Sequence, residues 1–423
     1  RLDTPYLRKN GKLQPASWQE VFAVVADRAK TTRPERMAAI VGDLVSVEAV
    51  KALKDLMLSL GVASLDCRQD GAKIGHGPRQ GYLFNTTIAG IENADALLLV
   101  GTNPRWEAPI INARIRKTWL RGDLKVARMG PKVDLTYGVT ELENNPADLL
   151  DFAAGKHAVF DMLKAAKHPM LIVGQGALTR ADGAAILAAC AQIARNTGMI
   201  GPSGESAWNG FNVLHTAAGR VGALDVCALP SKDGGKTTRE MLEAAKGSGL
   251  DILFLIGADE IDTQALGSTF VVYVGTHGDA GAHRADVILA GAAYVEKQVT
   301  YVNTEGRPQM TERASFPPGE AREDWAIFRA LTESLGNALP WNNLEELRAA
   351  MYKVAPQLMR LDHRTPAPTN ELADLAKAEG AMSAEPFRSP VTDFYMTNPI
   401  ARASRTMAEC SALKNVQKLE AAE

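Results

Sequence analysis

Short apolar runs and amphipathic segments alternate along most of the chain. The first run, residues 37–42, is followed by residues 47–60, in which apolar side chains recur at every third or fourth position. Continuous apolar runs of this length are typical of strands buried on both faces, and the longer period predicts a helix. Further runs occur at residues 95–100, 124–129, 169–174, 250–257, 269–275 and 287–289. This alternation predicts an α/β protein with several doubly wound parallel-sheet subdomains and helices on both faces.

Local helix and turn signals agree with this pattern. Ser17 and Glu20 have the spacing of a capping box, so we expect a helix from there to about Arg28. Asn10 and Gly11 predict a tight turn just before that helix. Further helices are predicted at residues 110–120, 180–197, 323–335 and 344–354.

Length and composition indicate a globular protein without an electrostatic signature. The chain has 423 residues, which predicts two to four subdomains. Basic and acidic residues nearly balance, 47 against 49, so no surface for nucleic acid or an anionic membrane is expected. No apolar run approaches the roughly 18 to 20 residues that a bilayer crossing requires. We therefore expect membrane association only through partner proteins.

Several predicted strands end in glycine, and these turns are the first candidates for a site. Gly101 and Asn103 lie between a strand and a helix, while Gly257 and Gly275 end two strands of a second nucleotide-like half. Backbone N–H groups in such turns favour phosphate. Because the carboxyl ends of parallel strands meet at one edge, we expect a common crevice there.

The cysteines and one histidine are the side chains that could bind a metal or act in catalysis. Cys67, Cys190, Cys227 and Cys410 are far apart and form no clustered zinc or iron-sulfur pattern. We interpret them as free thiols of a reducing compartment. His215 has no nucleophile or carboxylate at a meaningful spacing, so we interpret it as a hydrogen-bonded structural residue and not as a general acid or base.

Three strings closely resemble one family. They are residues 284–309 (RADVILAGAAYVEKQVTYVNTEGRPQ), 101–117 (GTNPRWEAPIINARIRK) and 393–407 (DFYMTNPIARASRTM). The first, which by itself also fits any strand, tight bend and second strand, is similar to a segment of the molybdopterin oxidoreductase fold. All three resemble the large iron-sulfur subunit of respiratory complex I in its mitochondrial and α-proteobacterial form. The resemblance covers essentially the whole chain and implies a molybdopterin-oxidoreductase-like α/β fold.

The resemblance also implies a domain organisation. Residues 1–30 are expected to lead in from an iron-sulfur region that is missing here. The molybdopterin-oxidoreductase-like region is expected at residues 31–362, with nucleotide-like halves near 35–200 and 245–355. Residues 363–423 are expected to form a linker, at 364–369, and a C-terminal partner-binding tail.

The tail carries residue types that are enriched at protein interfaces. Phe394 and Tyr395 form an aromatic pair, and Arg402 and Arg405 follow within the same string. We expect these side chains to contact a partner.

For function, the resemblance implies a structural part of the peripheral arm of proton-pumping NADH:quinone oxidoreductase. The chain would brace the iron-sulfur electron-transfer chain without being catalytic alone. It would hold no cofactor, with iron-sulfur clusters in the family's N-terminal region and FMN in a neighbouring subunit. Its partners would be other peripheral-arm subunits and the iron-sulfur N-terminal half of the same subunit. The place would be the matrix side of the mitochondrial inner membrane, or the cytoplasmic side of a bacterial inner membrane.

Two alternatives stay open. Cys67 lies about where cofactor-loaded members of the fold place a metal ligand, which would fit an active molybdenum or tungsten bis-pterin oxidoreductase of the formate dehydrogenase kind. Its surroundings depart from the expected ligand motif. The glycine-ended strands would also suit a soluble nucleotide-binding enzyme. No catalytic or metal-binding residue is assigned, and the candidates for a vestigial crevice are Cys67, Gly101, Asn103, Gly257 and Gly275.

The polar end of residues 284–309 has a separate interpretation. Glu296, Asn303, Glu305 and Arg307 are expected to form a hydrogen-bonded knot that holds the subdomains together, inherited from a cofactor site.

Overall fold

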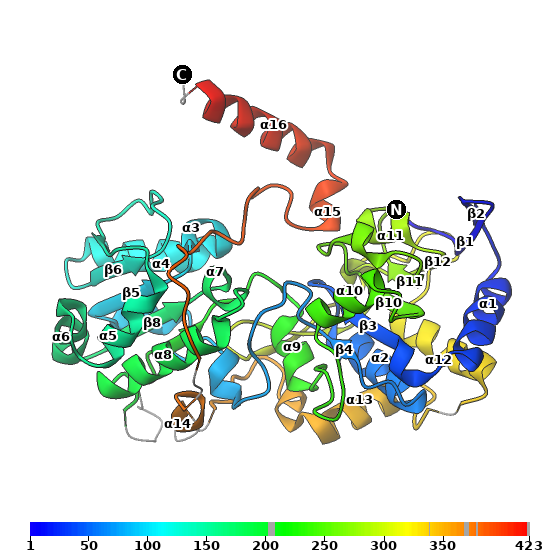
Figure 1. Ribbon diagram of the computed structural model, residues 1–423, viewed down its shortest axis with the longest axis horizontal. Coiled ribbons are helices and arrows are strands. Elements are labelled where there is room, and N and C mark those ends of the chain that lie inside the picture. The colour runs from blue at the N-terminus through cyan, green and yellow to red at the C-terminus, as the bar shows by residue number, and fades with distance from the viewer. Residues whose placement is uncertain (202–207, 338, 368–371, 378–379, 421–423) are drawn as a thin grey trace.

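Two lobes lie side by side, and the C-terminal segment crosses above them (Figure 1). In a computed structural model of the protein, the described residues are 1–201, 208–337, 339–367, 372–377 and 380–420, without the side chains of 416–420. Pro368 and Thr369 of the predicted linker lie outside the described residues.

The seven-stranded lobe is built on a sheet with strand order β2-β1-β12-β11-β10-β3-β4. Pairing is parallel from β4 through to β12, and a hairpin of β1 and β2 adds an antiparallel edge. Asn10 and Gly11 both have positive φ, as the predicted hairpin turn requires. The strands are β1 Tyr6–Lys9, β2 Lys12–Pro15, β3 Met37–Val41, β4 Leu65–Asp66, β10 Ile252–Ile256, β11 Phe270–Gly275 and β12 Val287–Ala290.

Helices cover both faces of this sheet. Successive strand residues point to opposite sides, so Ala39 belongs to one hydrophobic cluster and Ile40 to another. The predicted capping box of Ser17 and Glu20 begins the first helix. One face carries α1 Trp18–Thr31, α2 Val47–Ser59, α9 Arg220–Asp225, α12 Asp324–Leu335 and α13 Leu344–Val354, and the other carries α10 Thr238–Lys246 and α11 Ala280–Arg284.

The five-stranded lobe is entirely parallel, with strand order β7-β6-β5-β8-β9. Leu98 faces one side and Leu97 and Leu99 the other, and both sides are covered. The strands are β5 Ala96–Val100, β6 Lys125–Met129, β7 Thr140–Glu141, β8 Pro169–Val173 and β9 Phe211–Val213. The helices are α3 Pro104–Glu107, α4 Pro109–Leu120, α5 Leu149–Ala153, α6 Ala158–Ala165, α7 Gln175–Leu178 and α8 Gly183–Asn196. The predicted α/β fold with parallel sheets and helices on both faces is confirmed.

The sheets do not divide along the predicted halves near 35–200 and 245–355. Strands β3 and β4 come from the first half, yet β3 pairs with β10 from the second, Met37 lying opposite Ile252. The chain starts the seven-stranded sheet, leaves it to build the five-stranded lobe, and then returns. Adjacent strands can be distant in sequence because pairing depends on packing of the whole sheet, which local patterns do not carry.

Two further features position the site. Residues 284–309 continue from β12 into a single 3-10 turn, Tyr294–Glu296, and then into a small hairpin of β13 Thr300–Val302 and β14 Pro308–Met310. The C-terminal segment contains α14 Leu372–Leu375, α15 Pro399–Arg402 and α16 Arg405–Glu420. Within the part of the chain described, no helix has the length and apolar character that crossing a membrane requires.

Candidate functional site

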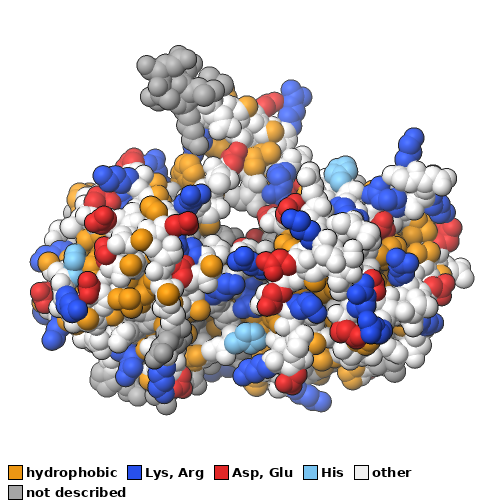
Figure 2. Space-filling view, in the orientation of Figure 1, with side chains coloured by type: hydrophobic (Ala, Val, Ile, Leu, Met, Phe, Trp, Pro, Cys, Tyr) orange, Lys and Arg blue, Asp and Glu red, His pale blue; other side chains and the backbone are white. Residues whose placement is uncertain are grey.

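A crevice lies between the two lobes, where the strands of both sheets end. Figure 2 shows the surface hollowed there, with charged side chains around it. A pocket of ≈ 340 Å³ is lined by Gln69 and Asp70, by Thr179 of the five-stranded lobe and by α10 of the seven-stranded lobe. Ligands of doubly wound sheets bind at the carboxyl ends of the strands, so this is the candidate site.

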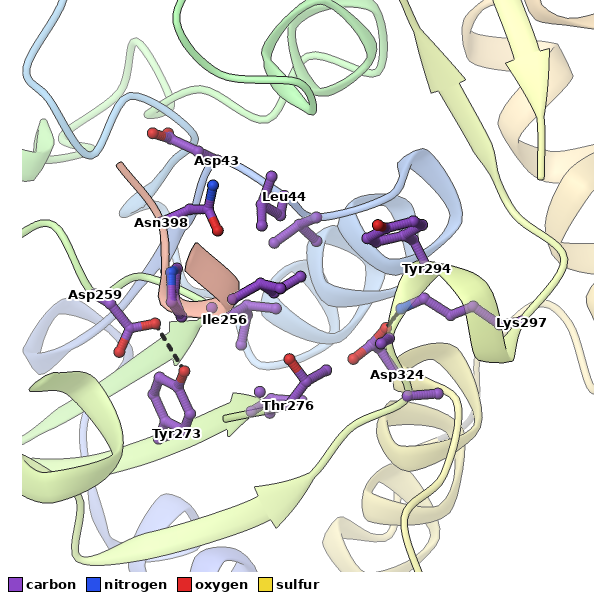
Figure 3. Close-up of a pocket in the computed structure, with 18 of the residues that line it drawn as sticks. Asp43, Leu44, Ile256, Asp259, Tyr273, Thr276, Tyr294, Lys297, Asp324 and Asn398 are labelled. Atoms are coloured by element: carbon purple, nitrogen blue, oxygen red, sulfur yellow. Dashed lines mark hydrogen bonds and ion pairs between the residues drawn. The ribbon is translucent and has the colours of Figure 1, made fainter. Parts of the chain in front are cut away.

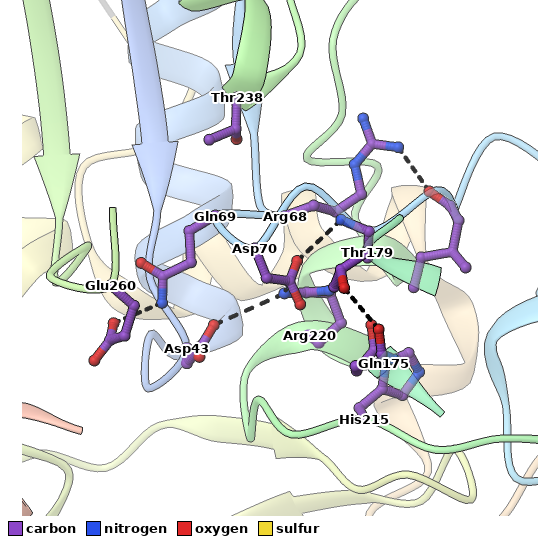
Figure 4. A network of polar contacts seen from close by, with 12 residues as sticks. Asp43, Arg68, Gln69, Asp70, Gln175, Thr179, His215, Arg220, Thr238 and Glu260 are labelled. Atoms are coloured by element: carbon purple, nitrogen blue, oxygen red, sulfur yellow. Dashed lines mark hydrogen bonds and ion pairs between the residues drawn. The ribbon is translucent and has the colours of Figure 1, made fainter. Parts of the chain in front are cut away.

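Arg220 is the centre of a polar network in the crevice (Figure 4). Its side chain is 1% exposed, and Nη2 lies 3.0 Å from an Asp70 oxygen and 3.8 Å from an Asp43 oxygen. Burial opposes the charge on the guanidinium, but the two carboxylates outweigh it and raise its pKa. Burial raises the pKa of Asp43 to about 6, although Arg220 acts in the opposite direction. The network joins the end of β3 to the loop after β4 and the start of α9.

His215 lies beside this network, at the end of β9. Its Nε2 donates to the Tyr82 carbonyl at 2.7 Å, and Nδ1 is 3.5 Å from Gln175 Nε2. Burial and the nearby Arg220 lower the pKa of His215 to about 4. A buried imidazole that is hydrogen-bonded to a backbone carbonyl and neutral at pH 7 is compatible with the predicted structural role of His215.

The turn after β5, which contains the candidates Gly101 and Asn103 for a vestigial crevice, is filled by the carboxylate of Glu107. Gly101 has φ 55°, and a Cβ there would lie 2.7 Å from the backbone nitrogen of Ala177, so glycine is required. The backbone N–H of Asn103 and the hydroxyl of Thr102 both donate to Glu107. Burial raises the pKa of Glu107 to about 7 against these hydrogen bonds. The Thr102 hydroxyl and the Asn103 N–H are both buried and already donate to this side chain, so they are not free to bind a phosphate.

Gly257 and Gly275 lie in a pocket at the ends of β3, β10 and β11 (Figure 3). Next to Gly257, Asp259 accepts from the Tyr273 hydroxyl and from the backbone N–H of Gly281, both at 2.8 Å. Burial raises the pKa of Asp259 to about 6. Asn398, Pro399 and Ile400 of the C-terminal segment also line the pocket, in which ≈ 70 Å³ remains. This space suits a few water molecules and not a dinucleotide.

Three of the four predicted knot residues are adjacent. Arg307 donates to Glu305 at 3.1 and 3.2 Å, and its backbone N–H donates to Asn303 Oδ1 at 2.9 Å. The other Glu305 oxygen accepts from the backbone N–H of Ile88. Glu296 lies apart from them: it accepts two hydrogen bonds from Arg1, at 2.6 and 2.8 Å.

The sequence also matches known families. The molybdopterin oxidoreductase profile matches residues 1–334. The chain belongs to the molybdopterin oxidoreductase family. A second profile, for the C-terminal part of the G subunit of NADH-ubiquinone oxidoreductase, matches residues 364–410. The C-terminal tail therefore matches a model of its own, separate from the one that matches residues 1–334.

Two of the most similar curated proteins are subunits of the kind that the three sequence strings resemble. The chain is 41% identical over 415 residues to the mitochondrial NADH dehydrogenase [ubiquinone] iron-sulfur protein 1 of Solanum tuberosum, covering 98% of this chain and 54% of that protein. It is 40% identical over 414 residues to the G subunit of NADH-quinone oxidoreductase from Rickettsia bellii, covering 98% of this chain and 58% of that protein. The chain thus spans a little over half the length of these relatives.

A solved structure shares the fold. A chain of the formyltransferase/hydrolase complex from Methylorubrum extorquens, in complex with methylofuran, superposes with a TM-score of 0.55 at 17% identity, covering 78% of this chain and 98% of that chain. At this identity, the likeness concerns the fold alone.

The name of the molybdopterin oxidoreductase family implies a pterin cofactor, and the described residues do not fit one. A metal-ligating cysteine must present a thiolate to the crevice. Cys67 is instead 3% exposed within the hydrophobic core, and burial raises the pKa of its thiol to about 12. Its neighbours Asp66 and Arg68 pair with each other. Glu107 and the C-terminal segment take up space at the strand ends, so no step is assigned to a pterin here.

The central residues of the network were not predicted. Asp43 directly follows the strand at 37–42, and that position was a usable signal. Arg220 and Gln69 follow no strand directly and belong to no motif. Gln69 donates to Glu260 at 2.7 Å, a contact between segments far apart in sequence.

Acid should destabilise the fold through His215. The unfolded state binds a proton near pH 6.5 and the folded state only near pH 4. The histidine's contribution is therefore fully present above pH 6.5 and is lost as the pH falls towards 4, by up to about 3 kcal/mol. In urea unfolding at pH 7 and pH 4.5, His215→Gln should lose less stability between the two pH values than the unmodified chain. His363→Gln, at an exposed position, is the control and should keep the original slope. Equal slopes for His215→Gln and the unmodified chain would contradict the prediction.

Proposed function

We propose that this chain is a structural part of the peripheral arm of a proton-pumping NADH:quinone oxidoreductase, where it braces the iron-sulfur electron-transfer chain. The observation that carries the proposal is the 40 to 41% identity to subunits of this enzyme along 98% of the chain. The separate match of residues 364–410 to the C-terminal part of the G subunit supports the same assignment.

A bracing role without a redox cofactor of its own agrees with the chemistry of the crevice. Glu107 binds the donors after β5, the C-terminal segment lines the pocket after β10 and β11, and the Cys67 thiol is in the core. Iron-sulfur clusters would be carried by the N-terminal region of the family and FMN by a neighbouring subunit. Electron transfer needs fixed distances between clusters, which two fully packed lobes would supply.

The partners would be other peripheral-arm subunits, together with the iron-sulfur N-terminal half of the same subunit. Residues 1–30 would lead in from that half, residues 31–362 would form the α/β region, and residues 363–423 would include the linker and the tail. The location would be the matrix side of the mitochondrial inner membrane, or the cytoplasmic side of a bacterial inner membrane, with membrane contact only through the complex.

Purification of the tagged native protein from its membranes tests the function. NADH dehydrogenase activity, FMN and iron-sulfur clusters should copurify with it. The alternative, an active molybdenum or tungsten bis-pterin oxidoreductase of the formate dehydrogenase kind with Cys67 as ligand, requires stoichiometric metal and pterin in the same preparation. Finding these without FMN would overturn the structural role.

The adjacent residues Asn303, Glu305 and Arg307 give a second test. Arg307 connects Glu305 with the carbonyl of Asp362, so Arg307→Ala should loosen contact between the β13–β14 turn and the end of the α/β region, directly before the linker. We expect a loss of about 1–2 kcal/mol and a lower yield of assembled complex. Oxidation of NADH at the flavin should stay nearly intact in the complex that forms. Normal assembly with lost NADH oxidation would contradict a structural role for these residues.

A further inference from the structure

The C-terminal segment crosses between the lobes more than once. It first packs on the five-stranded lobe, where Phe387 is 2% exposed and its backbone exchanges hydrogen bonds with the Asn144 side chain at 2.9 and 3.1 Å. The Arg180 guanidinium lies 5.5 Å from the Phe387 ring centroid. The segment is therefore anchored on this lobe before it reaches α15.

The segment then enters the pocket of the seven-stranded lobe. Asn398, Pro399 and Ile400 lie among residues that follow β3, β10 and β11, including Leu44 and Thr276 (Figure 3). These strand ends are where a doubly wound sheet binds its ligand. A peptide of the same chain occupies that position.

Arg402 secures the segment by charge. Its Nε and Nη2 lie 2.6 Å from carboxylate oxygens of Asp279 and Glu260 respectively. All three side chains are between 19 and 26% exposed. Glu260 also accepts from Gln69, while Asp279 accepts from the first N–H of α11. Both carboxylates are therefore held in place by other contacts, and two charge-assisted hydrogen bonds on half-buried groups are stronger than ordinary surface pairs.

Beyond α15 the chain turns back to the five-stranded lobe. In α16, the Lys414 ammonium lies 3.9 Å from the ring centroid of Trp106, in α3. This is within the range of a cation–π interaction. Figure 1 shows α16 extending from α15 back above the gap between the lobes.

We propose that residues 383–414 form a strap that closes the crevice: the segment ties the two lobes together and occupies the strand ends of the seven-stranded sheet in place of a ligand. Because strap and pocket belong to one chain, their effective concentration is on the order of millimolar or higher, and the closed arrangement is the resting one. The strap stabilises the relative position of the lobes from within. The inference goes beyond the proposed function and does not depend on it.

Hydrogen exchange on the full chain tests the strap, with Arg402→Ala compared with Arg405→Ala. Arg405 is the matched control because its side chain is 93% exposed and pairs only along its own helix with Glu409, among the contacts described. In Arg402→Ala, amides of residues 257–260, 276–281 and 398–403 should exchange about tenfold or more faster, since two charge-assisted bonds are lost. Arg405→Ala should match the unmodified chain. Equal exchange in both variants would overturn the strap.

Salt provides a second measurement that needs no substitution. Charged pairs of this exposure weaken as ionic strength rises. Between 0.05 and 1 M NaCl the Debye length falls roughly four- to fivefold. Exchange in the same three segments should therefore rise in the unmodified chain, while the β5 and β10 cores stay protected. Unchanged protection at residues 398–403 in high salt would count against the proposal even if Arg402→Ala failed to fold.

Discussion

Replacing Asp225 with alanine should lower the free energy of unfolding by about 3–5 kcal/mol, because it leaves the largely buried guanidinium of Arg79 without its carboxylate partner. The Asp225 side chain is fully buried and accepts three hydrogen bonds: from Arg79 at 2.8 and 3.0 Å and from the Tyr82 hydroxyl at 3.0 Å. Arg79 also donates to the carbonyl of Thr365 at 2.8 Å. The carboxylate therefore fixes the loop before β5 against α9 and the start of the C-terminal segment.

Urea unfolding at pH 7 measures this effect, and Asp233→Ala is the control. Asp233 is an exposed carboxylate a few residues further along the chain, and a surface change of this kind stays within about 0.5 kcal/mol. Asp225→Asn keeps the shape and part of the hydrogen bonding, so it should fall between the two. A loss below about 1 kcal/mol for Asp225→Ala would show that Arg79 finds another partner or reaches solvent.

Gly42→Ala should be nearly as damaging, at about 3 kcal/mol, for a steric reason. A Cβ on Gly42 would lie 1.7 Å from the carbonyl oxygen of Gly257 and 2.9 Å from the backbone nitrogen of Ala258. These are main-chain atoms at the ends of adjacent strands, so no side chain can rotate away. Relief requires β3 and β10 to separate where the Asp43 and Asp259 turns begin.

The matched control for this change is Gly278→Ala. A methyl group added to Gly278 would have no heavy atom of the described chain within 4 Å apart from its own residue and its two chain neighbours. The residue also has no positive φ, so alanine should be tolerated. Thermal unfolding should show a lower Tm for Gly42→Ala and an unchanged Tm for Gly278→Ala. Equal Tm values would contradict the prediction, because they would mean that the ends of β3 and β10 can move apart at little cost in free energy.

The local elements were predictable because their causes are local. The capping box at Ser17, the turn at Asn10 and Gly11 and the apolar runs of β5 and β10 each act within a few residues, and each was confirmed. The division of strands between the sheets was not predictable. It depends on β3 pairing with β10, a contact between distant segments whose apolar runs look alike.

In the candidate site, too, local features could be predicted from the sequence and contacts between distant segments could not. Strand-end glycines correctly located the turns around Gly101 and Gly257, since positive φ at such a turn is a property of the residue itself. The side chains that fill these turns are harder to predict. Glu107, beside Gly101, is only six residues away in the sequence, but Ile400, in the pocket of Gly257, comes from the distant C-terminal segment. Arg402 was expected to contact a partner, whereas in the structure it binds Glu260 and Asp279 of its own chain.

The excursion of the chain from β3 to the five-stranded lobe and back has a consequence for biosynthesis. Strand β3 leaves the ribosome well before its neighbour β10, because more than 200 residues lie between Val41 and Ile252. At about 5–20 residues per second this interval lasts on the order of 10–40 s. During that time the five-stranded lobe can fold, while β3 and α2 expose apolar surface. The nascent chain should therefore need chaperone protection at β3 and α2, and the strap, which follows the strands of both lobes in the sequence, can dock only when both lobes are complete.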